Sequence, residues 1–304
     1  MSGGVQRRRA APTFVLSVAF ASMAAIFMLA MLGLFAWQSL PVWRHEAWAY
    51  PAGKIWFYRN QRFGALPMIY GTVVVAGIAL LLAGPVGVGT AIFTAEFLPK
   101  RARLATKVAV ELLSGIPSVV YGLLGVLFLR NWVYAALERF DPLSGDTLLT
   151  AGLLLAVMIL PTVMTLSDDA LRGVPASQRL AARGLGLNSA ETIFSVTLPQ
   201  ATPGILSAVL LALGRALGET IAVFLVVGRQ DNRWPENLLS LRPLLESGQT
   251  LTSKLGGSET NIAYGDPLHW SAVVGLALLL LALSAVVTLA GIRLGQRKGG
   301  DAPV

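Results

Sequence analysis

The chain has 304 residues, of which 55% are hydrophobic and only 13% charged, and its mean hydropathy of +0.65 lies far from that of a soluble domain. It has no cysteine, and its two histidines, His45 and His269, lie far apart, so thiol chemistry is excluded and no metal site is expected. The net charge of +8 would suit a nucleic-acid partner, but its distribution along the chain indicates membrane topology instead.

Six apolar segments are long enough to cross a hydrocarbon core of ~30 Å as helices, and they are too continuous for lipid-facing β-strands. The first apolar segment follows three arginines and is longer than the apolar core of a signal peptide. We therefore expect it to remain in the mature protein as a transmembrane helix. The expected spans are roughly 14–37, 68–97, 105–129, 148–166, 200–228 and 269–292. The sequence therefore predicts an all-α polytopic membrane protein with six transmembrane helices, forming a single membrane domain over residues 1–304.

The charges indicate how this domain is oriented. If the N-terminus is cytoplasmic, the inner connections hold thirteen basic and five acidic residues, whereas the outer connections hold ten basic and nine acidic residues. Because lysine and arginine concentrate on the cytoplasmic side of membrane proteins, we expect a multi-pass protein with both termini in the cytoplasm. The aromatic residues of the first outer connection, such as Trp48, Tyr50 and Trp56, are expected to anchor it at the membrane interface.

Helix-breaking residues interrupt the second and third spans. Gly84, Pro85, Gly87 and Gly89 lie within six residues and predict a kink or a tight helix crossing. A second break is expected at 115–118, which reads Gly-Ile-Pro-Ser. The embedded acid Glu111 lies just before it; it either has a structural role or belongs to a charged pathway.

The inner connection at 167–199 is expected to fold into two short helices. Pro175 begins the first, Gly186 ends it, and Asn188 or Ser189 caps the second, which runs through Glu191. Two helices joined at a glycine form a compact knob, which suits docking into a groove of another protein.

The fifth span carries two charges, Arg215 and Glu219, four residues apart. On a continuous helix they would share one face, with Cβ atoms roughly 5–6 Å apart. Each charge costs at least ~2.5–3.5 kcal/mol at mid-membrane, so the pair either neutralises itself structurally or lines a pathway. Glu111 is an alternative partner for Arg215.

The inner knob resembles the EAA coupling loop of ABC importer permeases, normally E-A-A-x3-G-x9-I-x-L-P. In that family the loop inserts into the ATPase subunit. Leu180 stands where the family has glutamate, which leaves docking by shape and apolar contact and removes the usual polar contact. The matching positions are Ala181, Ala182, Gly186, Val196, Leu198 and Pro199.

Longer stretches resemble the phosphate-importer permeases. FGALP at 63–67, AEF at 95–97 and ELLSGIPSVVYG at 111–122 are typical of this family. GRALGETIAV at 214–223 resembles its PstC type, whereas the sister PstA type has G-E-T-A-P-L after the shared glycine.

The resemblance implies a type I, MetI-like permease architecture and half of a translocation pore. The implied partners are a PstA-type permease, PstB-type ATPase subunits docked through residues 174–199, and an extracytoplasmic phosphate-binding protein, in the inner (plasma) membrane of a bacterium. ATP and Mg would lie on the ATPase, with no cofactor on this chain. No G-x4-G-K-[ST] loop occurs, so we expect no enzyme activity here.

Arg215 and Glu219 suit a phosphate path. Arginine offers a planar fork of donors that keeps its charge, and monohydrogen phosphate can donate a hydrogen bond to Glu219, whereas sulfate cannot. Three alternatives stay open: a permease for another oxyanion such as sulfate or molybdate, a non-conducting membrane scaffold or sensor, and a membrane enzyme that uses the three embedded charges.

Overall fold

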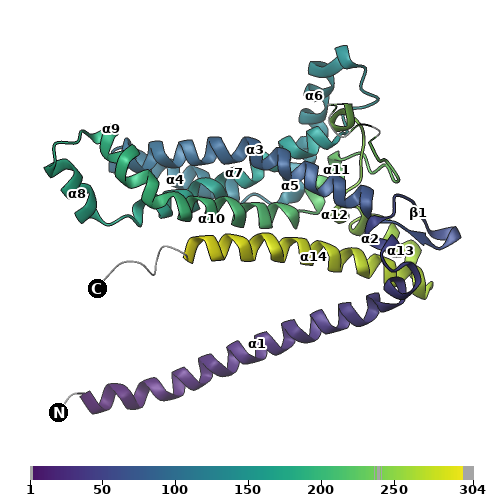
Figure 1. Cartoon of the computed structure of the whole chain (residues 1–304), viewed down its shortest axis with the longest axis horizontal. Coiled ribbons are helices and arrows are strands. Elements are labelled where there is room, and N and C mark those ends of the chain that lie inside the picture. Colours follow the sequence, from purple (N-terminus) through teal and green to yellow (C-terminus); the bar gives the residue numbers. More distant parts are fainter. Residues whose placement is uncertain (1–2, 236, 238–239, 241, 297–304) are drawn as a thin grey trace.

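The computed structural model describes residues 3–235, 237, 240 and 242–296 (Figure 1). Within this part of the chain, six helical segments are long and apolar enough to cross a membrane, and the predicted all-α fold with six spans is confirmed. The segments are Phe14–Glu46, Leu66–Glu96, Ser118–Phe140, Leu148–Arg172, Ser189–Leu217 and Pro267–Gly295.

The elements follow one another along the chain with short connections. The long helices are α1 (Gly3–Glu46), α3 (Leu66–Glu96), α4 (Lys100–Ser114), α7 (Leu148–Arg172), α10 (Leu198–Leu217) and α14 (Pro267–Gln296). The short helices are α2 (Ala49–Ala52), α5 (Ser118–Leu124), α6 (Arg130–Leu137), α8 (Ala176–Gly184), α9 (Ser189–Thr192), α11 (Ile221–Val226), α12 (Leu251–Leu255) and α13 (Glu259–Ala263). Two π-helical turns, Gly125–Leu129 and Ile193–Thr197, continue α5 and α9. The 3₁₀ turns are Tyr58–Asn60, Glu138–Phe140 and Arg242–Leu245. The strands β1 (Trp56–Phe57) and β2 (Arg62–Phe63) pair antiparallel, Trp56 opposite Phe63.

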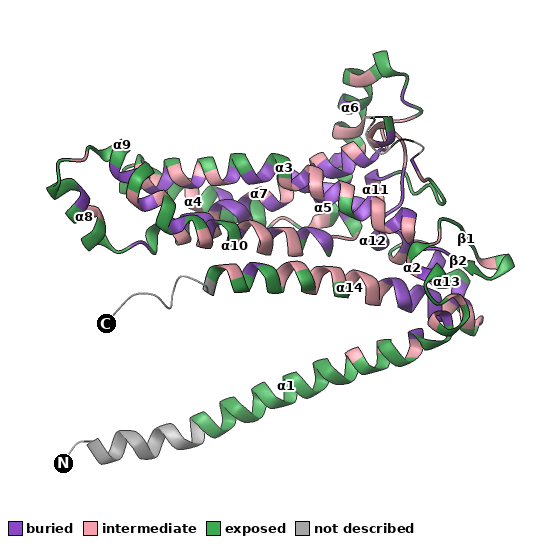
Figure 2. Ribbon diagram, viewed as in Figure 1, coloured by how far each residue is buried: buried purple, intermediate pink, exposed green. Residues whose placement is uncertain are grey.

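The bundle is arranged around α3 and α7, which pack against each other most extensively. On the other side of α7 lies α10, which also packs against α14, and α14 packs against α1 (Figure 1). Burial is concentrated along α3 and α7, whereas the apolar residues of α1 from Phe14 to Leu29 are exposed (Figure 2). Toward its N-terminus α1 diverges from the bundle (Figure 1).

The close crossing of α3 and α7 depends on Gly87. A Cβ atom at this position would lie 2.8 Å from Cγ1 of Val163 on α7, which is closer than side chains can approach. Pro85 is accommodated inside α3, which continues without interruption to Glu96. The glycine-rich segment therefore forms the predicted tight crossing.

Two of the predicted spans are wrong in their bounds. The segment 105–129 is interrupted after Ser114, because Pro117 has no amide hydrogen and disfavours the helical conformation of the residue before it; the apolar span begins only at Ser118. The segment 200–228 is interrupted at Gly218, since α10 ends at Leu217 and α11 begins at Ile221. Glycine is a poor helix former, and its amide bonds back to Arg215 O in a tight turn.

At the end of the bundle opposite α8 and α9, the connections between the spans form a cap with its own apolar core. Tyr50, Trp56 and Phe63 are at most 3% exposed and pack with Leu251 and Leu276. The interpretation of Tyr50 and Trp56 as interface anchors is therefore wrong, because the cap encloses them, whereas Trp48 is 84% exposed. The Tyr50 hydroxyl donates to Ala272 O at 2.7 Å, and burial raises the pKa of this hydroxyl well above its usual value.

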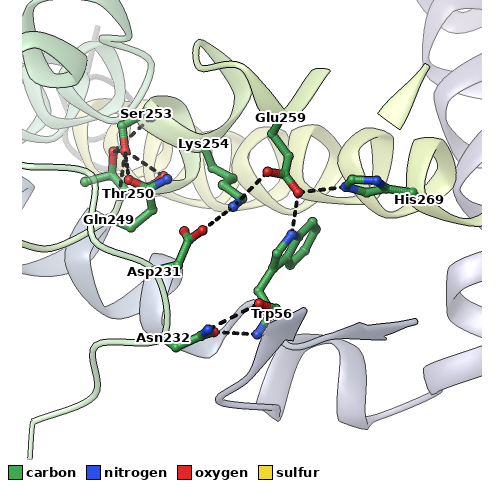
Figure 3. A network of polar contacts seen from close by, with 9 residues as sticks. All are labelled: Trp56, Asp231, Asn232, Gln249, Thr250, Ser253, Lys254, Glu259 and His269. Atoms are coloured by element: carbon green, nitrogen blue, oxygen red, sulfur yellow. Dashed lines mark hydrogen bonds and ion pairs between the residues drawn. The ribbon is translucent and has the colours of Figure 1, made fainter. Parts of the chain in front are cut away.

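A network of buried charges joins three parts of this cap (Figure 3). One carboxylate oxygen of Glu259 accepts from Trp56 Nε1 at 2.6 Å and lies 2.7 Å from His269 Nε2. Its other oxygen lies 3.0 Å from the ammonium group of Lys254, which donates to Asp231 at 2.7 Å. Lys254, Glu259 and His269 are at most 8% exposed, whereas the Asp231 side chain is 38% exposed, so the pair of Lys254 and Glu259 is largely shielded from water.

We expect Glu259→Gln to loosen the cap. Burial raises the pKa of the Glu259 carboxyl, but the charge of Lys254 and the hydrogen bonds from Trp56, Lys254 and His269 outweigh it, so the pKa is lowered. A lowered pKa means that the carboxylate stabilises the fold above the unfolded-state pKa of about 4.3, and that this contribution is lost as the pH falls through the folded-state pKa. The substitution should cost about 3 kcal/mol at neutral pH.

Hydrogen exchange of residues 249–263 measures this loss. Glu259→Gln should speed exchange at pH 7 and flatten its acid dependence, while Glu138→Gln, which changes an exposed acid, should leave exchange unchanged. Wild-type exchange rates in Glu259→Gln at pH 7 would show that the network does not stabilise the cap.

We expect Gly87→Ala to destabilise the bundle by about 1–3 kcal/mol, because the added methyl group overlaps Val163. Thermal unfolding of the purified chain measures the effect. Gly84→Ala on the same helix is the matched control, since nothing lies within 4 Å of a Cβ atom there. Equal midpoints for the two variants would contradict the assigned crossing.

Candidate functional site

Arg215 lies in the last turn of α10, beside the interruption at Gly218. Its side chain is exposed, and Nη1 donates to Thr162 Oγ1 on α7 at 3.2 Å. A guanidinium group has five N–H donors, and this is its one hydrogen bond within the described part of the chain. The remaining donors point to no acidic partner among the described residues, where no ion pair within 4.0 Å involves Arg215.

Glu219 lies in the interruption itself, between α10 and α11. Its Oε1 accepts a long hydrogen bond of 3.4 Å from the amide of Ala222, the second residue of α11. The prediction that Arg215 and Glu219 share one helix face is wrong, because the helix ends at Leu217 before it reaches Glu219. The carboxylate is therefore held by the next helix, and it forms no ion pair with a described residue.

Glu111 lies in the last turn of α4, before the other interruption. Its side chain is exposed, and within the described residues it too has no ion-pair partner. The structure therefore does not pair Glu111 with Arg215.

The two interruptions are nevertheless brought close together. The helices that follow them, α5 and α11, pack against each other, and a Cβ atom at Gly122 would lie 3.1 Å from Cα of Ala222. Across the first interruption, the Tyr121 hydroxyl donates to Leu113 O at 2.8 Å. Non-helical backbone at membrane depth is tolerated where it is buried in protein or lines a cavity. Two adjacent interruptions, with Arg215, Glu219 and Glu111 in or beside them, therefore form a candidate pathway segment.

The inner connection folds as two short helices, as the sequence predicts. Gly186 has a φ of +90°, which favours glycine and turns the chain after α8. Asn188 caps α9 through a capping box with Glu191. The sequence positions of Pro175, Gly186, Asn188 and Glu191 sufficed to predict this arrangement.

The residues that match the coupling loop divide into two sets. Leu180 is 66% exposed, whereas Ala182 is 5% exposed. Ala181 and Pro199 are exposed, and Val196 and Leu198 are half-buried, with Leu198 against the apolar cluster that joins α3, α7 and α10. The knob therefore presents Leu180 outward while its other end rests on the bundle. Figure 1 shows α8 and α9 projecting beyond that end of the bundle.

Two side-chain contacts of the site cannot be predicted from the sequence. Thr162 gives no signal as a partner of Arg215, because 53 residues separate them. Arg179 on α8 pairs with Glu96 on α3 at 2.7 Å across 83 residues; AEF at 95–97 was recognised as a family motif, but nothing in the sequence connects it with α8.

Comparison with known proteins identifies the family. Residues 87–299 match the family described as the binding-protein-dependent transport system inner membrane component. The phosphate transport system permease protein PstC of Mesorhizobium japonicum is 34% identical over 92% of this chain and 89% of its own length. PstC 1 of Mycobacterium tuberculosis is 38% identical over 75% of this chain and 72% of its own length. The resemblance to PstC-type permeases is therefore confirmed.

Solved structures share the fold at low sequence identity. A chain of a bacterial alginate ABC transporter aligns with a TM-score of 0.61 at 14% identity, covering 97% of this chain and 99% of its own. A chain of the MetNI methionine ABC transporter aligns with a TM-score of 0.54 at 19% identity, covering 77% of this chain and 93% of its own. The predicted MetI-like permease architecture is confirmed. The chain belongs to the family of inner membrane components of binding-protein-dependent transport systems.

Proposed function

We propose that this chain forms one half of the translocation pore of an ATP-driven phosphate importer. The support for phosphate is the likeness to PstC permeases over most of the chain, at 34% and 38% identity. The fold alone does not specify the cargo, because one fold serves many functions. The chain itself is a permease subunit and hydrolyses no ATP; ATP and Mg bind to a partner ATPase.

One observation carries the pore assignment: the exposed Arg215, near the end of the span Ser189–Leu217, has a single hydrogen bond and no acidic partner among the described residues. A charge facing lipid there would be costly, so such residues face a bundle interior or a water-filled path. The unused donors of its guanidinium group suit a tetrahedral oxyanion, which they can bind in a bidentate manner. Glu219 lies four residues after Arg215, and its negative charge repels the anion. It therefore weakens the binding of the anion to Arg215 enough for the anion to be released.

The other half of the pore is a PstA-type permease. Leucines on α4 and α5 near the interruptions are exposed, with Leu112 at 71% and Leu123 at 51%. Glu111 lies beside Leu112 on the same exposed helix. A second permease that covers this face would remove Glu111 from lipid and close the path around Arg215.

The orientation follows from the ends of the helices. The first residues of α1 and the last residues of α14 lie at the same end of the bundle as α8 and α9 (Figure 1). The basic inner connections favour a cytoplasmic location for this end in a bacterium, where α8 and α9 would dock a PstB-type ATPase. The cap around Glu259 then faces outward, where an extracytoplasmic phosphate-binding protein delivers its cargo.

Arg215→Ala should lower phosphate uptake about tenfold or more, since it removes charge-assisted hydrogen bonds to the anion. The measurement is uptake of labelled phosphate into liposomes that contain the assembled complex and its binding protein. Glu219→Gln should lower uptake less, because it keeps the cap on α11 but changes the charge in the path.

Arg139→Ala serves as the control, because it removes an exposed arginine of an outer connection. Normal phosphate flux in both Arg215→Ala and Glu219→Gln would make the two residues structural. If the wild-type complex takes up sulfate or molybdate in place of phosphate, the assignment of phosphate as the cargo is wrong.

Leu180→Ala should weaken binding of the ATPase about tenfold, because the exposed leucine loses apolar area that docking would bury. Leu180→Glu should weaken it further, since a carboxylate would enter an apolar contact. Titration of the ATPase onto the detergent-purified permease pair measures both. Tighter binding by Leu180→Glu would show instead that the ATPase retains a polar pocket for the family's glutamate.

A further inference from the structure

One arginine of α8 bonds the knob formed by α8 and α9 to the ends of α3 and α7, and the π-helical turn Ile193–Thr197 continues α9 into α10. Nη1 of Arg179 donates to Oε1 of Glu96 at 2.7 Å, and Nη2 donates to Leu171 O at 2.6 Å. Glu96 is the last residue of α3, and Leu171 lies in the last turn of α7. A single guanidinium group therefore bonds α8 to the ends of two other helices.

The position of this contact favours its strength. The Glu96 side chain is 9% exposed and the Arg179 side chain 24% exposed, so water screens the pair less than a surface pair. Both acceptors lie at helix C-termini, where the helix dipole attracts a cation. Charge-assisted hydrogen bonds in such a geometry favour the arrangement in which Arg179 is bonded to both helix ends over the arrangement without these bonds, by roughly tenfold or more.

Within the described residues, α8 has little else that fixes it to α3 and α7. Ala182 is its one buried residue, and Arg183, one turn beyond Arg179, is exposed and forms no ion pair with a described residue. The remaining packing of α8 is against α9 and the π-helical turn after it.

The helix that Arg179 contacts also contacts Arg215 of the candidate pathway segment. Leu171, which bonds Arg179, and Thr162, which bonds Arg215, both belong to α7. At about 1.5 Å per residue they are ~14 Å apart along one helix. Because α7 is tightly packed against α3 at Gly87, a displacement of its end moves the helix as a unit.

We propose that Arg179 is a positioning residue that makes α8 move together with α3 and α7, so that movement of the docked ATPase reaches the helix that contacts Arg215. The inference rests on the proposed function, in which α8 docks an ATPase. Without Arg179, the ATPase would still bind α8, but its movement would no longer be passed directly to α3 and α7, and only the continuation of α9 into α10 would remain.

The first experiment compares phosphate transported per ATP hydrolysed in liposomes containing the whole complex. Arg179→Gln and Glu96→Gln should each lower this ratio several-fold while the ATPase still co-purifies. Arg179→Lys, which keeps the charge but not the fork, should recover part of it. Arg139→Gln, which changes an exposed arginine outside the docking segment, is the control and should keep the wild-type ratio.

Three results would overturn the inference: wild-type ratios in both Arg179→Gln and Glu96→Gln, an equal loss in Arg139→Gln, or loss of ATPase binding in the first two variants. The last result would make Arg179 necessary for forming the docking surface only. If the wild-type complex moves no phosphate, the proposed function fails instead.

A second measurement needs no phosphate flux. The chain has no cysteine, so spin labels can be attached to Leu185→Cys at the end of α8 and Phe97→Cys just after α3, both exposed. In the otherwise wild-type complex the distance between the labels should be narrowly distributed and equal with and without ATP. The Arg179→Gln substitution should broaden this distance distribution. If the distribution in Arg179→Gln is as narrow as in the otherwise wild-type complex, the inference is overturned.

Discussion

In hydrocarbon, every backbone N–H and C=O group that leaves a helix must find a partner within the protein, and this constraint determines how the chain can interrupt its spans. After Ser114 the Tyr121 hydroxyl satisfies Leu113 O at 2.8 Å. After Leu217 the Glu219 carboxylate accepts from the amide of Ala222. The two following helices, α5 and α11, then support each other by packing. The interruptions are thus stable features, which allows charged residues to be kept beside them.

The helix α7 contacts both candidate functional regions of the chain. Near its middle Thr162 accepts from Arg215, and near its end Leu171 O accepts from Arg179. Its packing against α3 depends on the missing side chain of Gly87, so the two helices cannot slide apart without opening a void in a close-packed interior. The packing of this pair is therefore one connection between the knob and Arg215, beside the continuous segment from α9 into α10.

Local signals were sufficient for much of the fold. Apolar run lengths predicted six spans, and Gly186, Asn188 and Glu191 predicted the two helices of the knob, because these effects act within a few residues. The contacts that failed to be predicted join distant positions: Trp56 reaches Glu259 across 203 residues, and Arg179 reaches Glu96 across 83. Arg215 and Glu219 were misplaced for a local reason, since the apolar run outweighed Gly218 in the assignment of the helix.

Chains of alginate and methionine ABC transporters share this fold at 14% and 19% identity, so the fold alone does not specify a cargo. Glu219 illustrates how the fold is related to the proposed contact with the anion. One of its carboxylate oxygens caps α11, which orients the other oxygen and reduces the entropy lost when that oxygen accepts a hydrogen bond. Arg215 is oriented in the same way by Thr162. Helix ends that the membrane requires to be satisfied therefore also preorganise the groups that would contact a passing anion.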